Sequence, residues 1–271
     1  MKRDKNELFE YLRLNKEMLI TQKLNGEMKR ADAFEAPIIL ADFHDEVEKA
    51  NKPVTDDIDE LKVKVVINTT NLMDGHGDVH IPGLWTKSLK ENKRIKHLQE
   101  HEMKFDHIIA DKSDLKVYTQ TMTWKELGYN YPGNTEALIF ESNVKRSRNE
   151  YMFKEYKDGN VDNHSVGMRY VKILLAMNSD SKWDAEEKAN WDKYIDQVAN
   201  RKDVEEQGYF WPVLEAKAIE GSAVPAGSNW VTPTLENNMK SEPVDATPEP
   251  LKSTQLTSEE IVKRITNHFN N

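Results

Sequence analysis

The apolar residues of this chain gather in short strand-like segments, which are separated by helical segments of irregular length. Residues 61–67 alternate between Leu, Val or Ile and polar or smaller side chains, and residues 115–124 are rich in Thr, Val and aromatic residues. Residues 164–177 are β-branched and apolar, and residues 211–224 form a further such segment. This composition predicts strands. Because the regular strand–helix alternation of a parallel doubly wound sheet is missing, we predict an α+β domain. We expect it to be built on a β-barrel or a strongly curved antiparallel sheet ringed by helices.

Several of the intervening segments carry apolar residues at helical spacing. Near the N-terminus, Leu8, Leu12 and Leu19 fall on roughly one face of a charged segment. A short strand is expected at residues 105–110. Helices are expected at residues 5–30, 84–102, 142–157 (capped by Ser142) and 182–207.

The composition changes after residue 230. Residues 231–256 contain four prolines among Ser, Thr and Glu, which is typical of a disordered linker. Thr257 and Glu260 then form a capping box, and Ile261, Ile265 and Phe269 make one apolar stripe of a short helix. We therefore divide the chain into an N-terminal helical extension (1–34), a main domain (35–230), a linker (231–256) and a C-terminal helix (257–271).

The bulk composition excludes several classes of protein. With no cysteine in 271 residues, a disulfide scaffold, a thiolate zinc site and a cysteine nucleophile are impossible. The formal net charge of −9 argues against a general nucleic-acid binder. The start MKRDKNELFEYL has no apolar core, and no stretch approaches 18 apolar residues. We therefore expect neither a signal peptide nor a membrane span, and a cytoplasmic protein.

The stretch HLQEH, residues 97–101, allows two kinds of hydrolytic site. As H-x-x-E-H on a helix, it would offer His97 and His101 to a zinc ion and Glu100 as the base. Three fixed positions are a weak pattern in a chain with 8 His and 47 acidic residues, and no downstream glutamate ligand is evident. Alternatively, one of the two histidines serves as the base of a serine nucleophile.

Two further stretches carry candidate residues. In DGHGDVH, residues 74–80, the Asp and His side chains could hold a metal, but turn chemistry is the more common role of such a segment. Ser165 is the only serine set inside an apolar strand and followed closely by a glycine. A small residue there would leave room for a substrate backbone, although a strand serine is usually a packed or solvated bystander.

Four stretches of the chain together resemble the prohead maturation proteases of tailed bacteriophages. They are DGHGDVHIPGLWTKSLKEN, HLQEHEMKFDHII, NHSVGMRYVKI and EGSAVPAGSN. In that family an Asp-rich turn ending in D-x-x-x-P-G precedes a helix. A histidine followed by an acid comes next, then a strand with S-x-G and a strand with E-x-S-x-V. Order and approximate spacing agree over residues 60–232.

The resemblance implies a serine nucleophile at Ser165 and a general base at His101, which is followed by Glu102. It places the third, orienting member on Glu220. In such a site the imidazole takes the hydroxyl proton, and the carboxylate fixes the imidazole tautomer and stabilises the imidazolium.

The family is related to the herpesvirus assembly proteases, in which helices ring a β-barrel and the third catalytic member is a histidine. His107 and His164 therefore remain alternatives to Glu220. His164 is disfavoured because it adjoins Ser165 and points to the opposite face of a strand. Backbone amides near Gly167, or Arg169, are the candidate oxyanion donors.

The function implied by the resemblance is a serine endopeptidase that cleaves scaffold protein, major capsid protein and itself inside the assembling procapsid, in the host cytoplasm. It needs no cofactor, nucleic acid or membrane. Residues 257–271 would dock on capsid or scaffold protein and residues 231–256 would be cut; the alternative is a tail that merely tolerates variation. Residues 182–207 would form a homodimer contact or a surface excursion. The alternatives are a non-catalytic assembly factor with the same fold and a zinc hydrolase.

Overall fold

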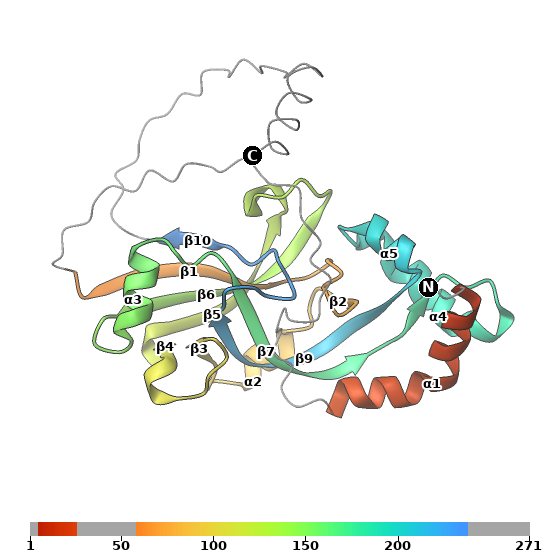
Figure 1. Cartoon of the computed structure of the whole chain (residues 1–271), viewed down its shortest axis with the longest axis horizontal. Coiled ribbons are helices and arrows are strands. Elements are labelled where there is room, and N and C mark those ends of the chain that lie inside the picture. The colour runs from red at the N-terminus through yellow and green to blue at the C-terminus, as the bar shows by residue number, and fades with distance from the viewer. Residues whose placement is uncertain (1–4, 26–57, 238–271) are drawn as a thin grey trace, which may run out of the picture. The chain divides into compact units, whose positions relative to one another are not determined.

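Two β-sheets lie at the centre of the computed structural model, which describes residues 5–25 and 58–237 (Figure 1). The first sheet is antiparallel throughout and has the order β10-β1-β6-β5. Its strands are β1 (Glu60–Thr69), β5 (Leu115–Thr123), β6 (Asn134–Lys145) and β10 (Thr234–Asn237). The second sheet is mixed and consists of β2 (Asp78–His80), β3 (Lys96–Gln99), β4 (Ile108–Ala110), β7 (His164–Ile173), β8 (Ala176–Met177) and β9 (Tyr209–Ala223).

The long strand β9 organises the second sheet. It runs parallel to β2 and β3 and antiparallel to β7 and β8. Near its C-terminal end it lies between two strands, so that Glu220 pairs with Lys96 of β3 on one side and with Gly167 of β7 on the other. Strand pairing therefore brings three segments that are far apart in the sequence into one part of the sheet.

The main hydrophobic core forms where the two sheets pack against each other. Ile67 of β1 and Phe140 of β6 are fully buried in it, together with Val166 of β7. A Cβ atom at Gly221 of β9 would lie 2.7 Å from Phe140 and 2.8 Å from Ile67, so this glycine allows the close approach of the sheets. Burial of each large apolar side chain contributes roughly 1.5–3 kcal/mol.

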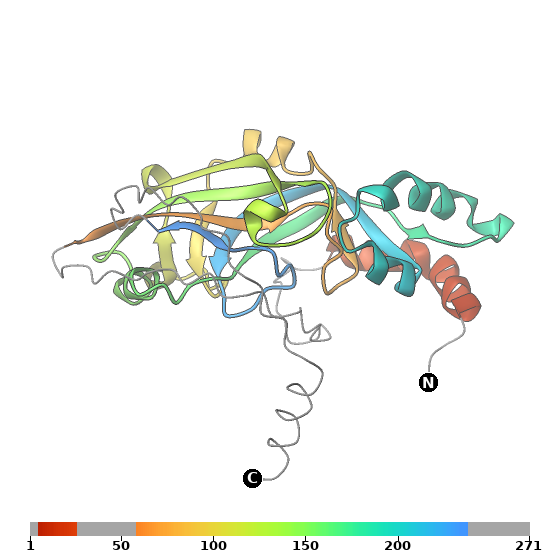
Figure 2. The same cartoon turned by 90° about the horizontal axis from the view of Figure 1, so that it is seen from above.

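Helices flank the sheets, and α1, α4 and α5 lie near the start of β9 (Figure 1). Figure 2 shows α1 beside α4 and α5, and the contact includes a Lys16–Glu187 ion pair at 2.7 Å. Phe9 and Leu12 of α1 are buried against the core. The helices are α1 (Lys5–Asn25), α2 (Thr86–Glu91), α3 (Glu150–Lys157), α4 (Ala185–Tyr194) and α5 (Arg201–Gln207), with 3₁₀ turns η1 (Phe105–His107), η2 (Lys112–Asp114), η3 (Lys125–Leu127), η4 (Lys182–Asp184) and η5 (Ile195–Gln197). Within the described ranges, no helix is long and apolar enough to cross a membrane.

The strands predicted at 61–67, 115–124, 164–177 and 211–224 are confirmed. The strand predicted at 105–110 is confirmed only for Ile108–Ala110, because Phe105–His107 forms a 3₁₀ turn, and the single helix predicted at 182–207 is divided into α4 and α5. Two further predicted helices are partly wrong. The first ends at Glu91, and residues 96–99 form β3 because β9 supplies a pairing partner. The second begins only at Glu150, since β6 continues to Lys145. Its cap is Asn149, which accepts a hydrogen bond from Met152 N at 3.0 Å, and not Ser142.

The predicted α+β class is confirmed, whereas a closed barrel is not found among the described strands. The two sheets are joined by side-chain packing and share no ladder of backbone hydrogen bonds, and the parallel β2–β9 and β3–β9 pairs make the second sheet mixed. The linker prediction is wrong for residues 231–237, because Thr234–Asn237 pairs with β1. The boundary predicted after residue 34, the rest of the linker and the helix at 257–271 fall outside the described residues.

Candidate catalytic site

The register between β7 and β9 places Ser165 and Glu220 on one face of the second sheet. Ser165 is opposite Ser222, and Gly167 is opposite Glu220. Directly paired residues point to the same side of a sheet, as do residues two apart on one strand. Ser165, Glu220 and Ser222 therefore share a face, while the neighbouring Gly221 packs against the other sheet.

Gly167 makes room for the Glu220 side chain. A Cβ atom at Gly167 would lie 1.9 Å from Glu220 Oε1, well inside van der Waals contact. The sequence interpretation, in which a small residue beside Ser165 leaves space for a substrate backbone, is thus wrong for this glycine. The space holds a fully buried carboxylate instead.

His101 lies in a tight turn directly after β3. Both Glu100 and His101 have left-handed backbones, with φ of 51° and 59°, and Glu102 N donates to Gln99 O at 3.0 Å. A left-handed backbone costs a non-glycine residue about 1–2 kcal/mol. The turn is held by Glu100 N, which donates to Ala223 O at 2.9 Å, and by His101 N, which donates to Ser222 Oγ at 3.1 Å. Backbone strain of this kind clusters at functional sites.

The imidazole of His101 is oriented by Glu220. Nδ1 of His101 lies 2.6 Å from Glu220 Oε1, and because a carboxylate oxygen accepts, the proton belongs on Nδ1. The lone pair is then on Nε2, as a general base requires. Among the described residues, neither His101 Nε2 nor Ser165 Oγ has a hydrogen-bond partner, although both atoms are buried. Ser165 and His101 therefore form no hydrogen bond with each other in this structure. In serine hydrolases the hydrogen bond between nucleophile and base often tightens only in the complex with substrate.

The alternative third members have other partners. His107 lies on η1, where Nδ1 is 3.0 Å from Asp106 Oδ1 and its side chain is 24% exposed. His164 points into the core, on the face of β7 opposite to Ser165. The structure thus places Glu220, and neither of these histidines, against His101. Arg169 is exposed on β7, and the described residues give it no hydrogen bond or ion pair.

A second group of histidines forms a buried hydrogen-bonded chain on the core side. His164 Nδ1 lies 2.9 Å from Thr232 O, which can only accept, so His164 Nε2 must accept from Tyr156 OH at 3.0 Å. The tyrosine oxygen then accepts from His97 Nε2 at 3.1 Å, and His97 Nδ1 accepts from Ser142 Oγ at 2.8 Å. The donor and the acceptor of each hydrogen bond in this series are thus determined, and both histidines are neutral.

The hydrogen bonds made by His97 contradict the zinc interpretation of HLQEH. His97 lies on β3 and not on a helix, so it is not one helical turn from His101. Both of its ring nitrogens are already used in hydrogen bonds, and its side chain faces Phe140 in the core. A histidine so engaged has no lone pair to give to a metal.

The buried histidines predict a loss of stability in acid. Burial lowers the pKa of His164 from 6.5 to about 4, and burial together with His164 lowers the pKa of His97. The unfolded chain then binds more protons below pH 6.5, so stability is fully present above 6.5 and is lost as the pH falls toward 4. Between pH about 7.5 and about 5, His164 alone should cost about 2 kcal/mol of the unfolding free energy.

Urea unfolding of the wild type and of His164→Asn at these two pH values tests this prediction. The variant should be less stable at the higher pH, because Tyr156 loses an acceptor, but it should lose less on acidification. The comparison also cancels the opposite effect of Asp74. Burial and the nearby Asp78 raise the pKa of Asp74 to about 6, which favours the fold as the pH falls. Equal pH slopes for the two proteins would contradict the prediction.

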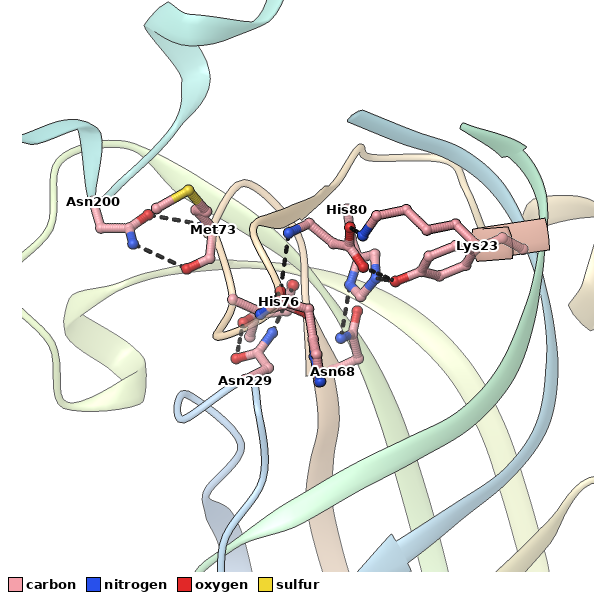
Figure 3. Close-up of polar contacts among 11 residues, drawn as sticks. Lys23, Asn68, Met73, His76, His80, Asn200 and Asn229 are labelled. Carbon is pink, nitrogen blue, oxygen red and sulfur yellow. Dashed lines mark hydrogen bonds and ion pairs between the residues drawn. The ribbon is translucent and has the colours of Figure 1, made fainter. Parts of the chain in front are cut away.

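The segment DGHGDVH forms an ordered turn (Figure 3). Asp74 Oδ1 accepts hydrogen bonds from His76 N at 2.9 Å and from Asp78 N at 3.0 Å, which is the turn chemistry expected from the sequence. Asn200 holds the segment in place through paired hydrogen bonds to Met73 N and O, at 2.9 and 3.0 Å. Asp78 is fully buried, where it accepts from Tyr170 OH at 2.7 Å and pairs with Lys23 of α1.

Sequence reasoning did not assign a role to Ser222. A signal was present, since Glu220 and Ser222 are two residues apart on a predicted strand and must share a face.

Comparison of the chain with protein-family models, with curated proteins and with solved structures gives no match.

Proposed function

We propose that the protein is a serine endopeptidase in which Ser165 is the nucleophile, His101 the general base and Glu220 the residue that orients the base. The observation that carries this proposal is the 2.6 Å contact between His101 Nδ1 and Glu220 Oε1. It leaves the Nε2 lone pair free, in a buried site on the second sheet to which Ser165 also contributes an unpartnered hydroxyl.

The chemistry follows from these positions. Ser165 Oγ attacks the scissile carbonyl carbon while His101 Nε2 takes the hydroxyl proton, and a tetrahedral oxyanion forms. When the intermediate collapses, the imidazolium gives that proton to the leaving amine, and an acyl–serine ester remains. A water molecule, deprotonated by the same nitrogen, then attacks the ester carbon. As the acid leaves, the imidazolium returns the proton to Ser165 Oγ, which restores the starting site. Glu220 stabilises the imidazolium in both halves, and amides near Gly167 or the Arg169 side chain would stabilise the oxyanion.

As the biological role we propose capsid maturation in a tailed bacteriophage. The support is the ordered set of four stretches that resembles prohead proteases, three of which meet near the C-terminal end of β9. The substrates would be scaffold protein, major capsid protein and the chain itself, inside the procapsid in the host cytoplasm. A fold related to the herpesvirus assembly proteases belongs to the same proposal, as does a homodimer contact through residues 182–207.

A non-catalytic assembly factor is the second candidate function. It is favoured by the 3% exposure of Ser165 and by the missing hydrogen bond between Ser165 and His101. In the enzyme, a movement that uncovers this face must precede substrate binding. A small covalent probe needs less of an opening than a peptide, so it separates the two candidates.

The deciding experiment is intact-mass spectrometry of the full chain after treatment with a small fluorophosphonate, with and without scaffold and capsid protein. We expect one added phosphonyl group on the wild type and on Ser113→Ala, which removes an exposed hydroxyl on η2, and none on Ser165→Ala or His101→Ala. Trimming of the chain and of added capsid protein should follow the same pattern and should resist a chelator. Equal labelling of Ser165→Ala, or an unlabelled wild type in the presence of both partners, would favour the non-catalytic role.

A further inference from the structure

The hydroxyl of Ser222 joins two parts of the candidate site. It is fully buried, it donates to Glu220 Oε2 at 2.6 Å, and it accepts from the backbone N–H of His101 at 3.1 Å. A hydroxyl can donate and accept at the same time, which neither alanine nor a charged side chain of this size can do. One atom thus contacts both the carboxylate and the turn that carries the base.

We propose that Ser222 is a positioning residue that sets the orientation and tautomer of His101. This inference rests on the proposed serine-protease function and extends it by one residue. The hydrogen bond to Oε2 holds the carboxylate so that Oε1 meets His101 Nδ1. The hydrogen bond from His101 N fixes the left-handed turn from which the imidazole projects. Together the two hydrogen bonds fix the orientation of the imidazole, and therefore the position of Nε2, and keep the proton on Nδ1.

The hydrogen bonds also distinguish Ser222 from a nucleophile, although it faces the same side as Ser165. The Ser222 proton is committed to Glu220, and its oxygen already accepts from a backbone amide. Ser165 Oγ has no partner among the described residues. Ser165 is therefore available to react, whereas Ser222 is engaged in holding the other two members.

The structure also explains why the site would be sensitive to this hydroxyl. Without it, Glu220 Oε2 is a buried carboxylate oxygen that has lost its donor, and the His101 amide loses its acceptor in a strained turn. Hydrogen bonds to charged groups are the stronger ones in proteins, and a buried group left unpaired is costly. The carboxylate can then rotate, and the imidazole can place its proton on either nitrogen.

The test uses the full chain with Ser222→Ala, Ser222→Thr and the matched control Ser88→Ala. Ser88 is also buried and its hydroxyl also bonds to β9, accepting from Ala218 N at 2.9 Å, but it touches neither Glu220 nor His101. For cleavage of capsid or scaffold protein, we expect Ser222→Ala to lower kcat by about 10- to 100-fold, with KM changed less than about threefold. Ser222→Thr, which keeps the hydroxyl, should recover most of kcat, and Ser88→Ala should leave it unchanged.

Nitrogen-15 NMR of histidine-labelled protein reads the tautomer of His101 directly and needs no substrate. The wild type, Ser222→Thr and Ser88→Ala should show the proton on Nδ1, and Ser222→Ala should show a mixture of both tautomers. An unchanged tautomer and kcat in folded Ser222→Ala would overturn the inference while the protease activity stands. If the wild type cleaves nothing, the proposed function fails, and the tautomer comparison still decides whether Ser222 positions His101.

Discussion

Replacement of Glu220 with glutamine is expected to lower kcat by about 10⁴-fold while the protein stays folded. Glu220 is fully buried and accepts from His101 Nδ1 and from Ser222 Oγ, both at 2.6 Å. If the amide turns its NH₂ group to His101, the imidazole must carry its proton on Nε2 and can no longer act as a base. If it turns its oxygen to His101, its NH₂ group meets the Ser222 hydroxyl, whose proton then has no acceptor.

In both orientations a neutral amide fails to stabilise the imidazolium that forms in each half of the reaction. Single-turnover cleavage of a capsid or scaffold substrate measures the loss without interference from product release. Glu215→Gln is the control, because Glu215 lies on the same strand but is partly exposed and pairs with Lys87 at 3.3 Å. A loss of less than about tenfold for Glu220→Gln would mean that the carboxylate does not orient the base, and His107 would then need testing in its place.

The sequence predicted those parts of the fold that depend on local pattern. The alternation in residues 61–67 suffices for β1, where Leu61 and Val63 are buried and Lys62 is exposed. The β-branched, apolar run at 164–177 suffices for β7. The segment around HLQEH was misread as helix because its charged residues suit a helix in isolation. Its strand character comes from β9, whose paired residues lie more than 120 positions later. Tertiary pairing of this kind overrides local propensity.

For the candidate site too, sequence motifs identify some residues, whereas other features depend on tertiary structure. Ser165, His101 and Glu220 were named through a resemblance of ordered motifs, and residue chemistry alone left the serine, zinc and turn interpretations open. What the sequence could not supply is geometry that depends on register: the Gly167–Glu220 pair, the left-handed turn at His101 and the place of Ser222 between them. A shift of β7 by one residue against β9 would turn Ser165 into the core.

Replacement of Lys23 with methionine is expected to cost about 3–5 kcal/mol of unfolding free energy at neutral pH, the largest stability effect among these predictions. Lys23 of α1 (labelled in Figure 3) pairs with the fully buried Asp78. Its ammonium group also lies over the Trp211 ring, 5.2 Å from the ring centroid. Methionine keeps the apolar contact of the side chain but removes the positive charge. Asp78 is then a buried carboxylate with Tyr170 OH at 2.7 Å and the nearby Asp74, which adds repulsion wherever it is ionised.

The double variant Lys23→Met/Asp78→Asn separates the charge effect from packing. Because it removes both charges, it should recover more than half of the loss, as is general for buried ion pairs. Arg201→Met is the matched surface control. Its ion pairs with Asp196 and Glu205 are exposed, so it should cost at most about 1 kcal/mol. Urea unfolding of the four proteins at one pH gives the comparison. A cost for Lys23→Met no larger than for Arg201→Met would show that the Lys23–Asp78 pair contributes little to the stability, and that water already reaches Asp78 in the folded protein.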